Sequence, residues 1–267
     1  MSPGAVWWRH ARVPLLAFVA LAVVSAVTPS DLFVARLFFD SLQGEWTGAH
    51  NWWVNEFVHT GGRWVVWAVE LVALSILVAA LLEPSLRRFR QPAGYFALSV
   101  ALTVGIVGLL KVMTNVDCPW DLAPFGGRFP LVHLFAERPD ALRQAQCFPA
   151  AHASSGYAML ALYFTLRERS VALARAGLCI GLAMGLVFGI CQQSRGAHFA
   201  SHDLWSAAIA WIVALSVYAF VFKARLWHAH PEPRRVTAGL PQFSHDTLSP
   251  GHLPVERAAA VRASRIR

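Results

Sequence analysis

Charge is scarce in this sequence. Only 14% of its 267 residues are charged, whereas a soluble domain needs roughly a quarter of its residues charged to stay solvated. Hydrophobic residues make up 56% of the chain, with 11 Trp and 17 Phe, and the mean hydropathy is +0.47. This composition excludes an ordinary soluble protein and indicates that lipid is the solvent.

A cleavable signal peptide is not evident either. The first apolar run, Val13 to Val27, has basic flanks, but the residues that follow it at positions 28–31 do not form a small-residue cleavage site. We therefore expect this run to remain as a signal-anchor helix.

The net charge of +8 could indicate a nucleic-acid binder, but its distribution does not. The basic residues lie in short segments between apolar runs and in about the last forty positions, which is typical of membrane orientation. We expect membrane lipids as partners and no nucleic acid, and the oligomeric state stays open.

Six windows of mostly apolar residues approach the roughly 20 residues that a bilayer core of about 30 Å requires. They cover about residues 12–30, 64–82, 94–113, 153–168, 175–193 and 203–222. The sequence thus predicts an all-α, polytopic transmembrane bundle of about six helices, forming one domain over residues 1–230. Residues 231–267 are rich in Pro, Arg, Ala and His, and we expect a basic, disordered cytoplasmic tail there.

The segments between the spans alternate in charge. The basic set comprises Arg9, Arg12, Arg87, Arg88, Arg90, Arg167, Arg169, Arg175, Lys223, Arg225, Arg234 and Arg235. The mixed or acidic set comprises Asp31, Asp40, Glu45, Glu56, Asp117, Asp121, Glu137 and Asp140. Because basic segments stay in the cytoplasm, both termini are predicted to be cytoplasmic. The protein would then be a multi-pass protein of a bacterial-type inner membrane, with its acidic loops in the periplasm.

Two features of the outer side stay open. The segment Leu32–Val58 carries many aromatic residues and either lies on the membrane surface as amphipathic pieces or packs over the helix ends. Cys118 and Cys147 share one external loop, where an oxidising compartment permits a disulfide, although the sequence does not show that they approach each other. Cys179 and Cys191 are expected to be packing residues within a span.

Three polar clusters lie at the predicted outer ends of helices. The first begins at Lys111 and continues V-M-T-N-V-D-C-P-W-D. The second is F-P-A-A-H-A-S-S-G at positions 148–156, and the third is Q-Q-S-R-G-A-H-F-A-S-H-D at positions 192–203. The connection between the last two spans is short, so the third cluster is confined to one membrane face near the start of the fourth helix.

Phosphoryl transfer suits this set of residues. Lys111 and Arg195 supply positive charge and donors for phosphate oxygens, and the first N–H groups of the fourth helix add an anion-binding end. One histidine can attack phosphorus while a second protonates the leaving oxygen. A carboxylate such as Asp203 can orient the attacking imidazole.

The three clusters resemble the signature of the type-2 phosphatidic acid phosphatase superfamily, whose usual form is K-x6-R-P, then P-S-G-H, then S-R-x5-H-x3-D. The resemblance covers about residues 95–220. It implies a helical core, a phosphohistidine intermediate, and no metal or other cofactor. Carried over to this chain, it makes Lys111 a phosphate ligand, His152 the general acid and His198 the nucleophile.

The chain departs from the usual pattern at several positions, which indicates a divergent branch. The departures are Cys118 for Arg, Ala150 for Ser, Ala151 for Gly, Gln192 for Arg and His202 for Asp, with Arg195 only three residues before His198 and Asp203 five after it.

From this pattern we predict that Arg195 binds phosphate and that Asp203 orients His198. Gln192 is expected either to bind phosphate or to bridge helices. His202 is expected to be a phosphate ligand or helix cap, and it is the alternative nucleophile.

The sequence therefore predicts a metal-independent phosphatase that hydrolyses a lipid phosphate ester or pyrophosphate at the periplasmic face. Phosphatidate, phosphatidylglycerol phosphate, a polyprenyl pyrophosphate and a lipopolysaccharide anchor phosphate all suit such a site. One alternative is a zinc-dependent membrane hydrolase with His152, His198, His202 and Asp203 as ligands, which two nearby cations disfavour. The other is a non-catalytic membrane protein that binds or transports phospholipid, which the missing Ser and Arg of the motifs allow.

Overall fold

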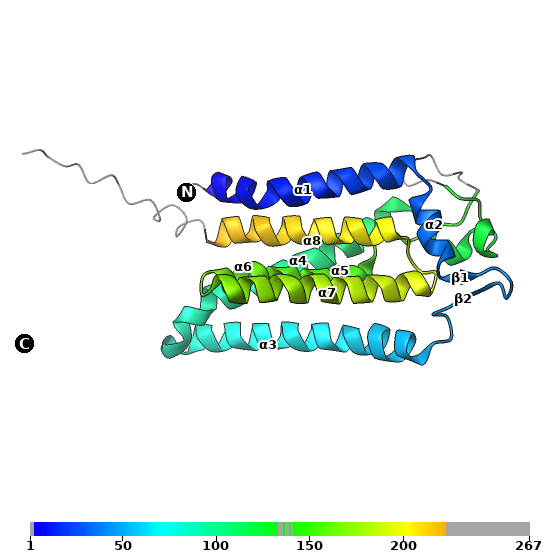
Figure 1. Cartoon of the computed structure of the whole chain (residues 1–267). Helices are drawn as coiled ribbons and strands as arrows, with labels where there is room; N and C mark the ends of the chain where they lie inside the picture. Colours follow the sequence, from blue (N-terminus) through cyan, green and yellow to red (C-terminus); the bar gives the residue numbers. More distant parts are fainter. Residues whose placement is uncertain (1–2, 133–135, 137–138, 140, 223–267) are drawn as a thin grey trace, which may run out of the picture. The chain divides into compact units, whose positions relative to one another are not determined.

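The computed structural model describes residues 3–132, 136, 139 and 141–222, so the predicted tail at 231–267 lies outside these residues. The long helices of this part are α1 (Pro3–Val27), α3 (Gly62–Leu82), α4 (Arg87–Thr114), α7 (Val171–Ser194) and α8 (Ala200–Val221). A π-helix, η1 (Trp53–Gly61), leads directly into α3, and a short 3-10 turn, η2 (Pro84–Leu86), leads into α4. Figure 1 shows the long helices running side by side.

Within the described residues, five helices are long and apolar enough to cross a membrane, and they correspond to five of the six predicted spans. The remaining predicted span, 153–168, is also helical but consists of three shorter pieces. These are α5 (Ala151–Tyr157), η5 (Ala158–Leu160) and α6 (Ala161–Arg167). The predicted all-α transmembrane architecture is confirmed.

Apolar side chains cover the outside of these helices as well as the inside. Leu16 and Val19 on α1, and Leu71 and Val78 on α3, are each more than half exposed. In water such a surface would drive aggregation, whereas in a bilayer it contacts acyl chains. The exposed apolar helix faces therefore belong to a membrane protein.

The buried core between α4, α6 and α8 is aromatic. Tyr95, Phe164, Tyr218 and Phe222 are almost completely buried, and the rings of Phe164 and Tyr218 stack with centroids 5.0 Å apart. The hydroxyl of Tyr95 donates to the carbonyl oxygen of Ala214 at 3.0 Å, which satisfies its polar end inside the bundle. This contact holds α4 against α8.

Glycines allow α5 and α6 to lie directly on α7. A Cβ atom at Gly156 would lie 2.8 Å from the backbone nitrogen of Gly185, and one at Gly177 would lie 2.8 Å from the carbonyl carbon of Leu162. Small residues at such crossings let helix backbones approach closely in membranes. As a result, the first turn of α5 lies beside the last turns of α7.

The segment after α1 packs over the ends of the helices. It contains α2 (Ser30–Arg36) and the antiparallel strands β1 (Phe39–Asp40) and β2 (Glu45–Trp46), which Figure 1 shows at one end of the bundle. Trp46 is buried, with its ring centroid 5.0 Å from that of Phe125 in the short turn η4 (Ala123–Phe125). Part of Leu32–Val58 therefore packs over the helix ends, as Ala35 and Trp46 show, whereas Phe33, Leu37 and Trp52 are exposed and residues 53–58 belong to η1. Whether the exposed residues lie on the membrane surface stays a prediction.

Candidate active site

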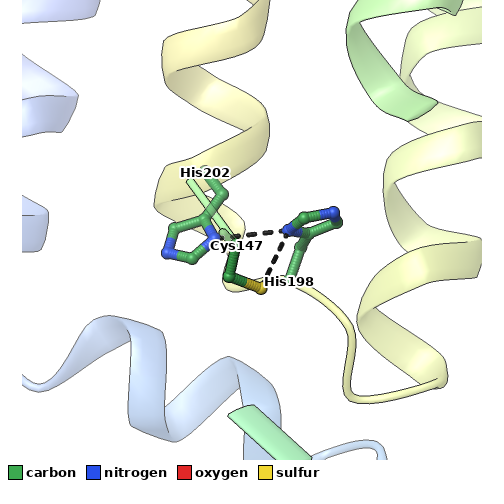
Figure 2. Close-up of side chains that lie close together, drawn as sticks. All are labelled: Cys147, His198 and His202. Atoms are coloured by element: carbon green, nitrogen blue, oxygen red, sulfur yellow. Dashed lines mark hydrogen bonds between the residues drawn. The ribbon is translucent and has the colours of Figure 1, made fainter. Parts of the chain in front are cut away.

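Two buried histidines lie where α7 turns into α8. His198 is in the turn and His202 is in the first turn of α8, and their Nδ1 atoms lie 3.4 Å apart. Their exposed fractions are only 7% and 3%. Figure 2 shows that the second ring nitrogen of His198 points away from His202. This nitrogen is therefore the one that can face a bound substrate.

The turn that presents His198 requires a glycine at position 196. Gly196 has a φ of +71°, which is the left-handed region that favours glycine. A Cβ atom there would also collide with the ring of Trp46. The N–H of Trp120 donates to the carbonyl oxygen of Gly196 at 3.0 Å. The N-terminal segment and the loop after α4 thus both hold this turn in place.

A disulfide holds the loop after α4 against the histidine pair. It joins Cys118 and Cys147, whose Cα atoms lie 5.2 Å apart. The sulfur of Cys147 lies 3.5 Å from Nδ1 of His198, and a dashed line joins these two residues in Figure 2. At the end of α4, the hydroxyl of Thr114 donates to the carbonyl oxygen of Phe148 at 2.5 Å. The two cysteines of this loop therefore border the candidate site.

Asp203 does not face His198, although the sequence analysis paired these residues. Its Oδ2 accepts a hydrogen bond from the side-chain amide of Gln193, and its buried Oδ1 has no hydrogen-bond partner. The carboxylate lies against α7, because a Cβ atom at Gly189 would be 2.5 Å from Oδ2. Consecutive helix residues point about 100° apart, so only one of residues 202 and 203 can face His198, and in this structure it is His202.

His152 lies at the start of α5, between two other rings. Its imidazole stacks on Phe188 at a centroid distance of 4.5 Å and contacts the ring of His59 at 4.5 Å. Its Nε2 is buried and has no hydrogen-bond partner. His152 lies close enough to His198 for its charge to affect the pKa of that residue, which it lowers. An unpartnered ring nitrogen is therefore available near the histidine pair.

A chain of side chains connects His152 to Arg195. His59 contacts His152, and its Nδ1 lies 2.5 Å from Nε2 of Gln192. The Oε1 atom of Gln192 accepts a hydrogen bond from Nη1 of Arg195 at 3.1 Å. Gln192 thus bridges η1 and the end of α7, which is the second of the two roles expected for it.

His59 is not among the residues predicted from the sequence. The signal for it was its place just before the predicted span 64–82, on the same predicted side of the membrane as the three polar clusters. No spacing in the sequence links position 59 to position 152 or 192, so only the packing of η1 against α7 brings these residues together.

Lys111 lies half-buried in the last turn of α4, and its positive charge reaches both His198 and His202. Burial lowers the pKa of His198 well below its usual 6.5, and the neighbouring His202 and Lys111 add to this effect. Low solvation and nearby positive charge disfavour the imidazolium form. His198 is therefore a neutral base at neutral pH.

Few side chains of the candidate site are arranged to bind a metal ion. Among the described residues, Cys147, His198 and His202 bring ligand-type atoms within 4.8 Å of one another. The sulfur of Cys147 is bonded to Cys118, so it is not a thiolate that could bind zinc. Because Asp203 faces α7, the zinc set considered from the sequence is not brought together.

Comparison with known proteins identifies the family. The pattern of the PAP2 superfamily matches residues 92–226, which contain the three polar clusters. No curated protein and no solved structure matches the chain significantly. Since the family match covers half of the sequence and the helices are long and apolar enough to cross a bilayer, this chain belongs to the PAP2 superfamily of phosphatases and is a membrane protein.

Proposed function

We propose that this protein hydrolyses a phosphate ester or pyrophosphate of a lipid through a phosphohistidine intermediate, without a metal ion. The observation that supports the proposal most strongly is the buried His198–His202 pair, since it combines a neutral imidazole with a partner on its Nδ1 atom. Lys111 and His152 lie close enough to His198 for their charges to affect its pKa. Arg195 lies three residues before His198 and contacts Gln192. These three residues supply the remaining chemistry of the proposal.

In the first step, Nε2 of His198 attacks phosphorus while Nδ1 keeps its proton and donates to Nδ1 of His202. Burial and the neighbouring His59 lower the pKa of His152 to about 4, so its protonated form depends on the negative charge of the bound phosphate, which favours the imidazolium. The bond from phosphorus to the ester oxygen breaks, and His152 in this form gives its proton to the leaving oxygen through Nε2. This assigns to His202 the orienting role that the sequence analysis gave to Asp203.

In the second step, a water molecule attacks the phosphohistidine, and His152 takes a proton from it. The bond between phosphorus and Nε2 of His198 then breaks, which releases inorganic phosphate and restores both histidines. Lys111 and Arg195 are the proposed phosphate ligands, because their charges complement those that build up on the phosphoryl oxygens.

The location of the site supports a lipid substrate. The histidine pair lies at one end of helices that are long and apolar enough to cross a bilayer, so acyl chains could stay in the membrane while the phosphate enters the site. The charge pattern of the loops supports a periplasmic orientation in a bacterial-type inner membrane. The disulfide beside the site fits an oxidising compartment.

The direct test is phosphate release by the purified full-length protein in detergent. The substrate panel comprises phosphatidate, phosphatidylglycerol phosphate, a polyprenyl pyrophosphate and a lipid A phosphate. We expect release from at least one member, unaffected by EDTA and inhibited by orthovanadate. Loss of activity in EDTA that zinc restores would overturn the metal-free mechanism, and absence of release from the whole panel would count against the lipid phosphatase itself.

A further inference from the structure

Gln192 occupies the position where the third motif of the family usually has Arg, but it does not supply the positive charge of that residue. It is neutral and only 3% exposed. Its amide nitrogen, the only part of the side chain that could donate to a phosphate oxygen, lies 2.5 Å from Nδ1 of His59. The motif therefore depends on Arg195, three residues further along, for its guanidinium.

We propose that His59 is a positioning residue that aims Arg195 at the phosphate through the side chain of Gln192. This inference rests on the proposed function, in which Arg195 is a phosphate ligand. It adds to the site a residue from outside the stretch 92–226 that matches the family.

The two ends of the Gln192 amide have different partners. A guanidinium only donates hydrogen bonds, so Arg195 needs the oxygen of Gln192 and not its nitrogen. His59 accepts from the amide nitrogen at Nδ1 and so keeps the oxygen turned toward Arg195. Without this acceptor, the amide could rotate and present its N–H groups to the guanidinium, which would then move.

The backbone around His59 is anchored to α7, which gives the side chain a defined position. The sulfhydryl of Cys191 donates to the carbonyl oxygen of Val54 at 3.1 Å. Just before η1, the N–H of Gly48 donates to the carbonyl oxygen of Ser194 at 2.9 Å. These contacts join η1 and the preceding chain to the last turn of α7, where Gln192 lies.

Two substitutions separate this role from simple packing against His152. His59→Phe keeps a ring of similar size beside His152 but removes the acceptor at Nδ1. His59→Asn loses the ring but places a carbonyl oxygen close to the former position of Nδ1. His50→Phe is the matched control, because His50 is exposed and lies in the segment that leads into η1.

The measurement is the affinity of each purified full-length variant for orthovanadate, by isothermal titration calorimetry, together with the kinetics of phosphate release. We expect His59→Phe to weaken orthovanadate binding about tenfold, because Arg195 would move and lose one hydrogen bond to the charged anion. It would raise KM with kcat within about twofold, because phosphate binding is lost in the ground state and the transition state alike. His59→Asn and His50→Phe would both stay within about twofold of the unsubstituted protein, since each leaves the relay intact.

Either of two results would overturn the inference. One is a His59→Phe protein that binds orthovanadate as well as the unsubstituted protein. The other is an equal loss in His59→Phe and His59→Asn, which would assign His59 a packing role. If the unsubstituted protein released no phosphate from any lipid while the two variants still differed in orthovanadate binding, the proposed function would fail and the relay would stand.

Discussion

The two sides of the candidate site are held together in different ways. On one side, His198 and His202 lie beside a disulfide and a turn that requires Gly196, so covalent and backbone constraints hold them. On the other side, His152 is held by ring contacts, and Gln192 by a side-chain relay. The residues of the first side lie almost wholly within residues 92–226, which match the family. The second side also includes His59, which lies before this stretch.

The same division holds for the whole chain. The proposed chemical groups lie within residues 92–226, but several of the contacts that support them come from before residue 92. Asp31 accepts hydrogen bonds from the N–H and the hydroxyl of Ser201 at 2.9 and 2.5 Å. Trp46 covers Gly196, and the N–H of Gly48 reaches the end of α7. The N-terminal part of the chain thus supports a site whose reacting groups lie elsewhere.

The largest expected effect tests the constrained side. His198→Ala removes the proposed nucleophile, so neither step can begin, and we expect phosphate release to fall by about 10³-fold or more on every substrate. His50→Ala, measured in the same colorimetric assay, serves as the control. A His198→Ala protein that still turns over, beside an inactive His202→Ala protein, would transfer the nucleophile to His202.

On the side of His152, the loss of activity is expected to depend on the leaving group of the substrate. His152→Ala removes the proposed acid, and turnover of an alkyl phosphate is expected to fall by about 10²-fold or more. An activated ester such as a nitrophenyl phosphate, where it is accepted, needs little protonation and would lose much less. Equal losses on both kinds of substrate would show that His152 does not act as an acid.

The adjacent residues His202 and Asp203 provide a sharper test of the constrained side. His202→Ala removes the partner of His198 on Nδ1, and we expect kcat to fall by about 10²-fold. Asp203→Asn would have a smaller effect, because its carboxylate faces Gln193 and α7. The opposite order would restore the assignment of the orienting role to Asp203 that the sequence motif suggested.

The disulfide is expected to affect stability more than chemistry. Replacing Cys118 and Cys147 together by Ser is expected to lower the free energy of unfolding by about 2–4 kcal/mol, which thermal unfolding in detergent would detect as a lower Tm. Cys179→Ser is the control, because Cys179 is a free, exposed cysteine. An unchanged Tm in the double variant would show that the disulfide does not stabilise the fold.

The smallest effect concerns pH. Burial and neighbouring positive charge lower the pKa of His198 below 6.5, so the neutral form that attacks phosphorus persists as the pH falls through 6.5. We expect any loss of kcat/KM from protonation of His198 to begin only below that pH. In the unfolded chain this histidine protonates near pH 6.5, whereas in the folded chain it stays neutral, so stability decreases progressively as the pH falls from about 6.5 toward the lower pKa of the folded state. This assignment would be contradicted by a loss of kcat/KM that begins above pH 6.5 and persists when each of the other histidines of the site is replaced.

Much of the fold could be predicted from the sequence because its signal is local. A run of about 20 apolar residues is long enough to cross a bilayer whatever lies beside it. Five such helices are present among the described residues. The three polar clusters could also be found locally, since His152, His198 and Lys111 lie in short motifs whose order along the chain is preserved.

What the sequence by itself determined is therefore which segments enter the membrane and which motifs could carry phosphate chemistry. The tertiary structure decided which of His202 and Asp203 meets His198, because that choice depends on the rotation of α8 against α7 and not on the order of residues. It also decided that Gln192 contacts His59, a residue 133 positions away, through the packing of η1 on α7. Apolar length acts within one helix, whereas a contact between side chains depends on how several helices are turned and set against one another.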